Sequence, residues 1–388
     1  MQYCMRMIKR TYWIDRIEKS WNHRPLVWLA GVRRAGKTVL CQSLDRVEYF
    51  DCEIPRVRQS MEDPEAFLRS VDGRRVALDE VHRLRNPSEL LKIAADHFPK
   101  IRLIATASST LHATRKFRDT LTGRKTSLWL TPMNGEDLRA FGATSYDHRL
   151  RNGGLPPFFL SSNFPERDVQ DWLDSYWAKD IQELFRLERH ASFQKFLELM
   201  FVRSSGIFEA TAFAGPCEVS RTTIFNYLKV LEVTKVCDMI RPFSTRKSTE
   251  IVSAPKTYAF DTGFVAYFRG WNDLRLEDKG ALWEHMVLNE IRSVWPEGEI
   301  RYWRDKQGHE VDFVLVRRGQ SPLAVECKWS TASADPSAFS VFRHHYPAGD
   351  NWVITGDSDR PLSHQTKMIR WTSMGLREMS NRLASFHS

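Results

Sequence analysis

Long apolar runs and paired cysteines are what this sequence has least of. No stretch of the 388 residues approaches the ~18 apolar residues that a membrane-spanning helix needs, so no membrane partner is expected. The first residues, MQYCMRM, lack the apolar core and small-residue cleavage site of a secretory signal. The six cysteines form no C-x-x-C pair, which argues against a disulfide framework and a structural zinc site. Together these absences predict a cytoplasmic protein.

Negative charge is also in short supply. The chain has 57 lysine and arginine residues against 48 aspartate and glutamate residues, a formal net charge of +9. A positive balance suits a nucleic-acid partner, although many basic proteins bind none. The apolar fraction, 42%, is that of an ordinary globular protein, and the length predicts about two to four domains.

The stretch from Leu26 to Leu40, LVWLAGVRRAGKTVL, has the form of a phosphate-binding loop. An apolar strand leads into GVRRAGKT, which fits G-x-x-x-x-G-K-[ST], and a helix is predicted directly after it. This context distinguishes the loop from a glycine-rich turn in some other α/β protein. Lys37 would reach the β- and γ-phosphates of ATP, and the Thr38 hydroxyl would ligate Mg²⁺. The residues expected to contact the nucleotide are Gly31, Arg34, Ala35, Gly36, Lys37, Thr38 and Val39.

A second apolar strand, Arg74–Glu80, ends in two adjacent carboxylates. Asp79 would hold Mg²⁺ through water, and Glu80 would orient or deprotonate the attacking water. The alternative for this pair is an ordinary turn at the end of a strand. The strand predicted over Ile101–Ser109 ends in hydroxyl residues, which can lie near the γ-phosphate at the carboxyl edge of an open sheet. Alternating strands and helices predict an α/β fold with a mainly parallel sheet.

Residues 193–245 show three helical patterns followed by a predicted hairpin. In the third helix, Ile224, Leu228 and Leu231 form an apolar stripe, and Ser220 is a good N-cap. The polar residues at its start would then face outward, as in the recognition helix of a helix-turn-helix. The alternative is a module that binds proteins. The residues expected to contact DNA are Arg221, Thr223, Lys229, Arg246 and Lys247.

A third pattern lies near the C-terminus, in the strands Glu310–Val316 and Leu323–Trp329. Glu326 and Lys328 share one face because side chains alternate along a strand, and Asp312 on the paired strand can meet them. Two carboxylates can hold a divalent metal that supplies a nucleophilic hydroxide and offsets phosphate charge. Lys328 would position or polarise the attacking water. The alternative is the alternating charge of any exposed strand.

The order of these motifs resembles the bacterial and archaeal AAA-type ATPases of the AAA_14 group that carry a DUF4143 C-terminal half, and the C-terminal pattern resembles the PD-(D/E)XK nucleases. The resemblance covers nearly the whole chain. The segments that carry it include GVRRAGKT, VALDEVHRL, LIATASST, LTGR, LTPMNGEDL, GGLPPFF, YWAKDIQELF, SRTTIFNYLKVLE, APKTYAFDTGFVAYFRG and YWRDKQGHEVDFVL. It implies a P-loop AAA-type ATPase domain at 1–145, a helical segment at 146–192, a winged helix-turn-helix at 193–260, and a restriction-endonuclease-like α/β domain at 261–388.

The resemblance also implies roles for individual residues. Arg124 matches an arginine finger or sensor, which would stabilise the transferring phosphoryl group in a neighbour's site. Thr106 and Ser108 match the position that holds the attacking water. Glu284, in the helix predicted over Gly280–Val294, matches an additional metal ligand beside Asp312 and Glu326. The weaker alternatives are Arg115, Arg118, Ser109 and Glu290.

The sequence therefore predicts an ATP- and Mg²⁺-dependent ATPase that binds DNA and processes branched, forked or damaged DNA with a metal-dependent endonuclease domain. Self-association is expected if Arg124 acts in a neighbour. Two alternatives stay open at this point. One is a DNA motor or remodeller that does not cleave. The other is a switch-type signalling ATPase whose winged helix and C-terminal domain bind protein partners.

Overall fold

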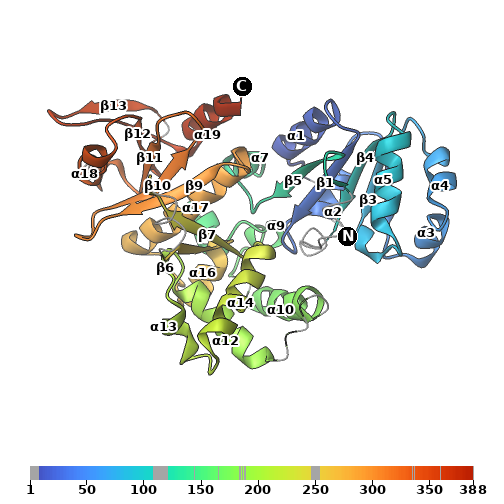
Figure 1. The fold of residues 1–388 in the computed structure, drawn as a ribbon, viewed down its shortest axis with the longest axis horizontal. Coiled ribbons are helices and arrows are strands. Elements are labelled where there is room, and N and C mark those ends of the chain that lie inside the picture. Colours follow the sequence, from blue (N-terminus) through green and yellow to red (C-terminus); the bar gives the residue numbers. More distant parts are fainter. Residues whose placement is uncertain are drawn as a thin grey trace. The chain divides into compact units, whose positions relative to one another are not determined.

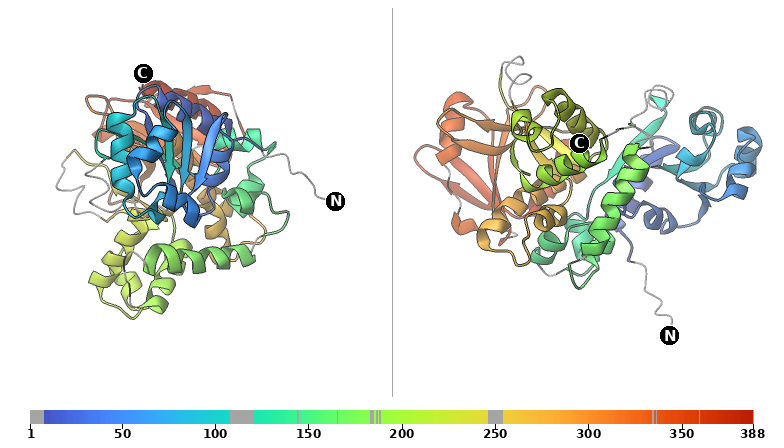
Figure 2. Two further views of the ribbon diagram at one scale, coloured as in Figure 1. Left: turned by 90° about the vertical axis from the view of Figure 1, so that its right-hand side faces the viewer. Right: turned by 90° about the horizontal axis from the view of Figure 1, so that it is seen from below.

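The fold is that of a computed structural model, which describes residues 8–107, 121–143, 145–164, 166–182, 185, 187, 189–245, 254–333, 335, 337–358 and 360–387. The chain forms two compact units (Figures 1 and 2). The first combines Met1–Ala143 with Gln170–Arg186 and Val233–Lys235; the second contains Thr144–Val169, Leu187–Glu232 and Val236–Ser388. Six residues singled out from the sequence lie outside the described ranges, namely Ser108, Ser109, Arg115, Arg118, Arg246 and Lys247.

The first unit is built on a five-stranded parallel sheet in the order β2-β3-β4-β1-β5, as the strand–helix alternation predicts. Every residue of β1 is buried, which is usual for a parallel sheet covered on both faces. Helices α1 and α5 lie on opposite sides of this sheet in Figure 1. The strands are β1 Leu26–Gly31, β2 Val47–Asp51, β3 Arg75–Asp79, β4 Arg102–Thr106 and β5 Lys125–Leu130.

A side-chain cap fixes the start of one helix in the first unit. Asp63 caps α4 by accepting from the backbone N–H groups of Glu65 and Ala66. The short elements are α2 Lys37–Gln42, α3 Pro55–Ser60, α4 Pro64–Ser70, η1 Val81–Arg83 and α7 Gly135–Ala140, and the longer helix α5 spans Pro87–His97. A later helix, α10 (Glu166–Ser175), leads into a π-helical segment, η3 (Tyr176–Gln182).

Helix α1 (Thr11–Trp21) precedes β1. It buries Trp13, Ile17 and Trp21, whose four-residue spacing places them on one face. Arg10, just before the helix, is 5% exposed and donates to the Ala35 carbonyl at 2.8 Å. Aromatic packing and a buried guanidinium therefore fix this helix against the sheet and the loop that follows β1.

The second unit contains one nine-stranded sheet in the order β13-β14-β12-β11-β10-β9-β7-β8-β6. Strands from the segment 193–260 and strands from the C-terminal segment join through the parallel pair β7/β9, in which Arg241 lies opposite Arg301. The strands are β6 Gly206–Ile207, β7 Cys237–Pro242, β8 Lys256–Ala259, β9 Glu299–Arg304, β10 Glu310–Val316, β11 Leu323–Lys328, β12 Asn351–Thr355, β13 Leu362–Gln365 and β14 Arg370–Met374.

The helices of the second unit include the predicted third helix of the 193–245 pattern. Helix α14 (Arg221–Val233) buries Ile224, Leu228 and Leu231, and the Ser220 hydroxyl accepts from the backbone N–H of Thr223 at 3.1 Å. None of the helices in the described ranges is long and apolar enough to cross a bilayer. The others are α8 Asp147–Asn152, α9 Pro156–Phe159, α12 His190–Val202, α13 Ala210–Ala214, α16 Thr262–Phe268, α17 Leu276–Val294, η4 Thr331–Ser333, α18 Ser337–His345, α19 Leu376–Ala384 and η5 Ser385–His387.

A buried ion pair ties α8 to α16. Arg149 lies 3.7 Å from the Asp261 carboxylate, and each side chain is 1% exposed. The Arg149 guanidinium also donates to the Thr262 hydroxyl at 2.7 Å, and Asp261 accepts from the backbone N–H of Gly154 at 2.7 Å. Removing one partner of such a pair leaves a buried charge uncompensated, so the pair holds these segments in a defined arrangement.

We expect Gly154→Ala to destabilise the second unit. A Cβ at this position would lie 2.4 Å from the Arg149 guanidinium, which Asp261 and Thr262 already hold. Overpacking of this kind costs about 1–3 kcal/mol, which urea denaturation followed by tryptophan fluorescence would measure. Gly280→Ala is the matched control, because a Cβ there meets no atom within 4 Å and alanine favours a helix by about 0.5–1 kcal/mol. Equal stability of the two variants would contradict this packing argument.

Candidate functional site

The loop between β1 and α2 has the backbone shape of an anion-binding loop. Gly36 adopts φ 93° and Arg34 adopts φ 61°, both in the left-handed region. Left-handed residues in such a loop turn neighbouring N–H groups toward one concavity, which suits phosphate oxygens. Glycine takes this conformation without strain, whereas Arg34 takes it at a cost that is common at functional sites. Val39, also predicted to contact the nucleotide, is 47% exposed on α2.

Lys37 lies within this loop with its ammonium turned onto the backbone. The side chain is 8% exposed, and Nζ donates to the carbonyl oxygens of Gly31 at 2.8 Å and Val32 at 3.2 Å. Burial lowers the pKa of Lys37, while the carboxylates of Glu80 and Asp180 act in the opposite direction. The ammonium is therefore held where it could exchange two carbonyl acceptors for phosphate oxygens.

Three hydroxyl groups converge on Asp79 at the end of β3. The Thr38 hydroxyl and the Tyr49 phenol each donate to Oδ2 at 2.7 Å, and the Thr106 hydroxyl donates to Oδ1. Asp79 is 3% exposed, so these donors replace the water that a carboxylate would otherwise bind. The predicted residues Thr38, Asp79 and Thr106 are thus brought together. Tyr49 was not predicted, because the pattern around β2 does not show which strand lies beside it.

Glu80 follows Asp79 in the left-handed conformation, with φ 53°. Its carboxylate lies 3.0 Å from Nδ1 of His82, and its backbone N–H donates to the Thr106 hydroxyl at 3.1 Å. Burial raises the pKa of Glu80, but His82 and the positive charge of Lys37 together hold it below its usual value. Glu80 is therefore ionised at neutral pH, and His82, which the sequence analysis did not assign, orients it.

A distant segment contacts the phosphate loop from η3. Arg33 forms an ion pair with Asp180, and the Arg33 carbonyl accepts from the indole N–H of Trp172 at 3.1 Å. Burial raises the pKa of Asp180, against the opposing charges of Arg33 and Lys37. π-Helical turns are frequent at functional sites. The sequence analysis assigned no site residue to this segment. The sequence signal for Asp180 is a charged residue in YWAKD next to the buried Tyr176 and Ile181.

Arg124 lies at the amino-terminal ends of the strands of this sheet, whereas the phosphate loop lies at their carboxyl-terminal ends. It precedes β5, whose first residue, Lys125, pairs with Leu26 at the start of β1, whereas the loop follows the end of β1. A six-residue strand spans roughly 17 Å, so Arg124 cannot reach the loop of its own chain. Its guanidinium contacts Asp96 at 2.7 Å. The predicted role of Arg124 is therefore compatible only with the site of another chain.

In the second unit, the antiparallel pair β10/β11 brings Asp312, Glu326 and Lys328 together. Asp312 accepts from the backbone N–H of Cys327 at 2.8 Å, and Glu326 lies 3.1 Å from Lys328 Nζ. Burial first, and then Asp312, raises the pKa of Glu326 well above its usual value. Burial lowers the pKa of Lys328, but Glu326 and Asp312 raise it above its usual value overall, so Lys328 is a cation that can orient water.

Glu284, on α17, has partners that were not predicted. It accepts from the Lys256 ammonium at 3.0 Å and from the Tyr258 phenol at 2.5 Å. Burial, followed by the Asp312 carboxylate, raises the pKa of Glu284 to about 7. Lys256 and Tyr258 are two residues apart on β8, so their side chains share a face of the strand. This shared face could have been predicted from the sequence KTY.

Glu290, the alternative to Glu284, is 1% exposed and accepts from the Ser380 hydroxyl at 2.5 Å. This contact gives it a structural role between α17 and α19. Within the ranges that the structure describes, no group of three His, Cys, Asp or Glu side chains is arranged to hold a metal ion. The carboxylates of Glu284, Asp312 and Glu326 are close enough to influence one another, but each points to its own partner.

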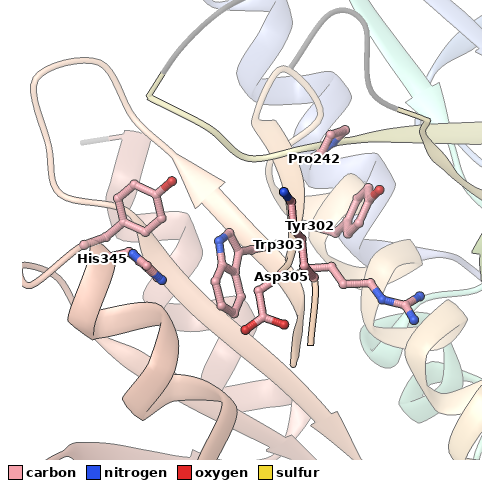
Figure 3. A pocket seen from close by; sticks show the side chains of 8 residues that line it. Pro242, Tyr302, Trp303, Asp305 and His345 are labelled. Atoms are coloured by element: carbon pink, nitrogen blue, oxygen red, sulfur yellow. The ribbon is translucent and has the colours of Figure 1, made fainter. Parts of the chain in front are cut away.

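A hollow of about 480 Å³ lies beside the end of β9 (Figure 3). Figure 3 shows Tyr302 and Trp303 at its centre, with His345 and Pro242 on either side. Its lining mixes aromatic and charged side chains, and Arg304 lies 3.7 Å from Glu310, next to the carboxylate cluster. The lining residues are Pro242, Tyr302, Trp303, Arg304, Asp305, Lys306, His345 and Tyr346.

The predicted DNA-contacting residues on α14 differ in exposure. Arg221 and Lys229 are exposed, and Lys229 contacts Glu232 at 2.7 Å. Thr223 is only half-buried, and its hydroxyl lies 2.9 Å from that of Ser220 at the helix start. Thr223 therefore takes part in capping the helix, whereas Arg221 is exposed and Lys229 is exposed but paired with Glu232.

Family models match three parts of the chain. An AAA domain matches residues 23–138, a domain of unknown function (DUF8612) matches 143–275, and another domain of unknown function (DUF4143) matches 279–374. Similar full-length proteins include Uncharacterized protein Rv2008c of Mycobacterium tuberculosis and Uncharacterized protein Mb2031c of Mycobacterium bovis. Each is 26% identical over 373 residues, which cover 93% of this chain and 83% of the relative.

Among solved structures, the chain is similar to the Walker-type ATPase PABY2304 of Pyrococcus abyssi, with 16% identity and a TM-score of 0.43 over 68% of this chain and 96% of that one. AMPPCP-bound DnaA from Aquifex aeolicus gives 12% identity and a TM-score of 0.27 over 58% and 87%. Neither score reaches the level of a shared overall fold. The assignment therefore rests on the family model and on the geometry of the phosphate loop: residues 23–138 are a P-loop ATPase domain of the AAA type.

Proposed function

We propose that this protein is an ATP-hydrolysing DNA-processing enzyme, in which the AAA-type domain drives a DNA-binding segment and a metal-dependent nuclease domain. The single observation that carries the proposal is the meeting of Asp312, Glu326 and Lys328 on adjacent strands in the second unit. A buried carboxylate, Glu326, and a half-buried one, Asp312, beside a protonated lysine suit phosphodiester hydrolysis better than structural packing, because packing alone would favour apolar residues.

The first unit would bind ATP with Mg²⁺ at the carboxyl edge of its sheet. Thr38 and Asp79 would hold Mg²⁺, and their 2.7 Å hydrogen bond places hydroxyl and carboxylate side by side for this role. Once bound, the ion offsets the charge of the phosphates. Lys37 would leave the two loop carbonyls and donate to phosphate oxygens. Glu80, ionised and held by His82, would accept the proton of the attacking water.

In the second unit, Asp312 and Glu326 would hold a divalent ion. Glu326 fits this role, because its Oε1 is buried and has no hydrogen-bond partner among the described residues. A bound divalent ion supplies a hydroxide and offsets the charge of a phosphate. Lys328, as a cation, would orient the attacking water toward the phosphate. Glu284, the third predicted ligand, is already bonded to Lys256 and Tyr258.

DNA would contact the second unit through basic side chains on two elements. Arg221 and Lys229 project from α14, and the order of helices and strands around α14, with β7 and β8 antiparallel after it, supports a winged helix. Arg304 and Lys306 line the hollow next to Glu310, where aromatic rings could stack on bases. These contacts, Arg246 and Lys247 of the predicted wing, and the net charge of +9 favour a polyanion.

Self-association follows from the position of Arg124. It lies at the amino edge of the sheet, away from the phosphate loop of its own chain, and precedes β5 in a polar turn. An arginine in this position can complete the nucleotide site only of a second copy. We therefore propose that the AAA-type domains assemble with Arg124 of one chain near the γ-phosphate bound by the next.

A second candidate function is a switch-type ATPase whose 193–260 segment binds a protein. One observation favours it: Phe225 is 56% exposed on α14, between the two basic residues expected to contact DNA. It borders a groove of about 610 Å³ that also includes Phe208, Leu228 and Met239. A large exposed ring beside an apolar groove is typical of a protein-binding surface.

We expect Lys37→Ala to remove ATP hydrolysis, lowering kcat by about 10²–10³-fold or more, because a charged donor to the transferring phosphate is lost. A phosphate-release assay would measure it, with circular dichroism to confirm folding. Lys100→Ala, at an exposed lysine of the same unit, is the control and should behave as wild type. Full hydrolysis by Lys37→Ala would overturn the nucleotide-site assignment.

We expect Glu326→Ala to abolish cleavage of labelled duplex, forked and four-way DNA in Mg²⁺ or Mn²⁺, since it removes a ligand of the proposed metal, while DNA binding and ATP hydrolysis persist. Glu297→Ala, at an exposed glutamate of the same unit, should cleave like wild type. If Glu326→Ala still cleaves DNA, the cleavage comes from another site or from a contaminant. Binding without cleavage by the wild type would leave a non-cleaving DNA motor or remodeller.

We expect Arg221→Ala to weaken DNA binding on every sequence and to reduce the salt dependence of the binding constant by about one phosphate contact. Fluorescence anisotropy across a salt series would measure both effects. Phe225→Ala is the companion variant, because it removes the exposed ring of the same helix without changing charge. If no DNA binds at low salt, and Phe225→Ala but not Arg221→Ala alters binding to a protein partner, the protein-binding candidate is the correct one.

A further inference from the structure

Lys256 is a buried lysine that the proposed cleavage step leaves without a role. Its side chain is 4% exposed, and its ammonium lies 3.0 Å from Glu284 Oε1 and 2.6 Å from Glu310 Oε1. The rings of Tyr258 and Tyr302 lie 5.6 and 5.9 Å from the same nitrogen. Two carboxylates and two aromatic rings thus enclose the ammonium, so its position is well determined.

The ammonium is charged in this environment. Two carboxylate oxygens within 3.0 Å of the nitrogen stabilise its charged form. Its two partners come from two elements, Glu284 from α17 and Glu310 from the start of β10. Arg304 is a second cation near this group, 3.7 Å from the other oxygen of Glu310.

A second divalent ion would need the same surroundings as the Lys256 ammonium, namely carboxylates on more than one side. A cation placed among carboxylates of a helix and a strand neutralises them, whether it is a metal ion or an ammonium. The ammonium holds its partners at hydrogen-bond distances of 2.6 and 3.0 Å, longer than the ~2.0–2.1 Å of Mg²⁺ ligands. Glu284 and Glu310 are therefore committed to Lys256, which leaves Asp312 and Glu326 as the pair open to a metal.

We propose that Lys256 is a built-in cation of the carboxylate cluster, occupying the place of a second divalent ion, so that the site takes one metal ion and not two. The inference rests on the proposed metal site at Asp312 and Glu326. Lys256 is a positioning residue in this account: it fixes Glu284 and Glu310 and contributes a positive charge beside the phosphate position. In this account Glu284 does not bind the metal ion as predicted, because its carboxylate is hydrogen-bonded to Lys256.

The origin of Lys256 gives the inference a second consequence. β8 belongs to the segment predicted as a winged helix, and Tyr258 on the same face of β8 also donates to Glu284. The charge that completes the cluster is therefore supplied by the segment that would contact DNA. A fragment beginning after β8 would lack this cation, and Glu284 would lose both of the partners that β8 supplies.

Counting bound Mn²⁺ tests the proposal without using cleavage. The full chain would carry Thr38→Ala, so that the nucleotide site contributes no Mn²⁺ binding, and would be titrated with Mn²⁺ while free ion is followed by electron paramagnetic resonance. We expect one bound ion per chain, and two after Lys256→Met, because methionine keeps the apolar stem but leaves Glu284 and Glu310 free. Mn²⁺ should also raise the thermal midpoint of Lys256→Met more than that of the parent.

Lys279→Met is the matched control, because Lys279 also bonds a carboxylate, Asp147 at 2.8 Å, away from the cluster; it should bind one ion. The double variant Lys256→Met/Glu310→Gln removes one carboxylate with the cation and should return to one ion. Two ions bound by the parent chain, or no gain by Lys256→Met, would overturn the inference. So would a Lys256→Met chain that stays unfolded in Mn²⁺ while the double variant folds.

Failure of the proposed metal site gives a different result from failure of the Lys256 proposal. If the parent binds no Mn²⁺ but Lys256→Met binds one ion, the lysine does stand in for a metal, and the metal site at Asp312 and Glu326 is wrong. If neither chain binds Mn²⁺, both proposals are wrong.

Discussion

The parallel pairing of β7 with β9 is the constraint on which the second unit depends. Through Arg241 opposite Arg301 and Pro242 opposite Tyr302, it makes one sheet of strands that the sequence analysis assigned to separate domains. In the sheet order, this pair links β8 and β7 to β9 and β10, so it joins the strand of Lys256 to the strand of Glu310. A short stretch of backbone hydrogen bonds therefore positions a buried charge cluster made of distant parts of the chain.

Both candidate sites consist of buried charges whose partners are built into the fold. Asp79 receives three hydroxyl donors and Lys37 donates to two carbonyls, while Lys256 is matched by two carboxylates. Each partner lowers the cost of keeping the charge away from water. Oε1 of Glu326 is one exception: it has no hydrogen-bond partner within the described ranges, and it belongs to a proposed metal ligand.

Local features of both units were predictable, while long-range contacts were not. The strand–loop–helix around Lys37, the helix Pro87–His97 and the capped helix at Ser220 follow from motifs and periodicity within about fifteen residues. The Arg33–Asp180 pair joins positions 147 apart in sequence, and Lys256 meets Glu310 across 54 residues. A single sequence shows that such residues are polar and flanked by apolar ones, but not which distant partner they meet.

The chain passes from one compact unit to the other after residues 143, 169, 186, 232 and 235. The segment that carries Trp172 and Asp180 belongs to the ATPase unit, yet both of its ends continue into the other unit. No single proteolytic cut could then release either unit as an intact, uninterrupted polypeptide. A truncation at any one of these boundaries divides at least one of the two units, so none of them marks a place where the chain can be shortened without loss to a unit.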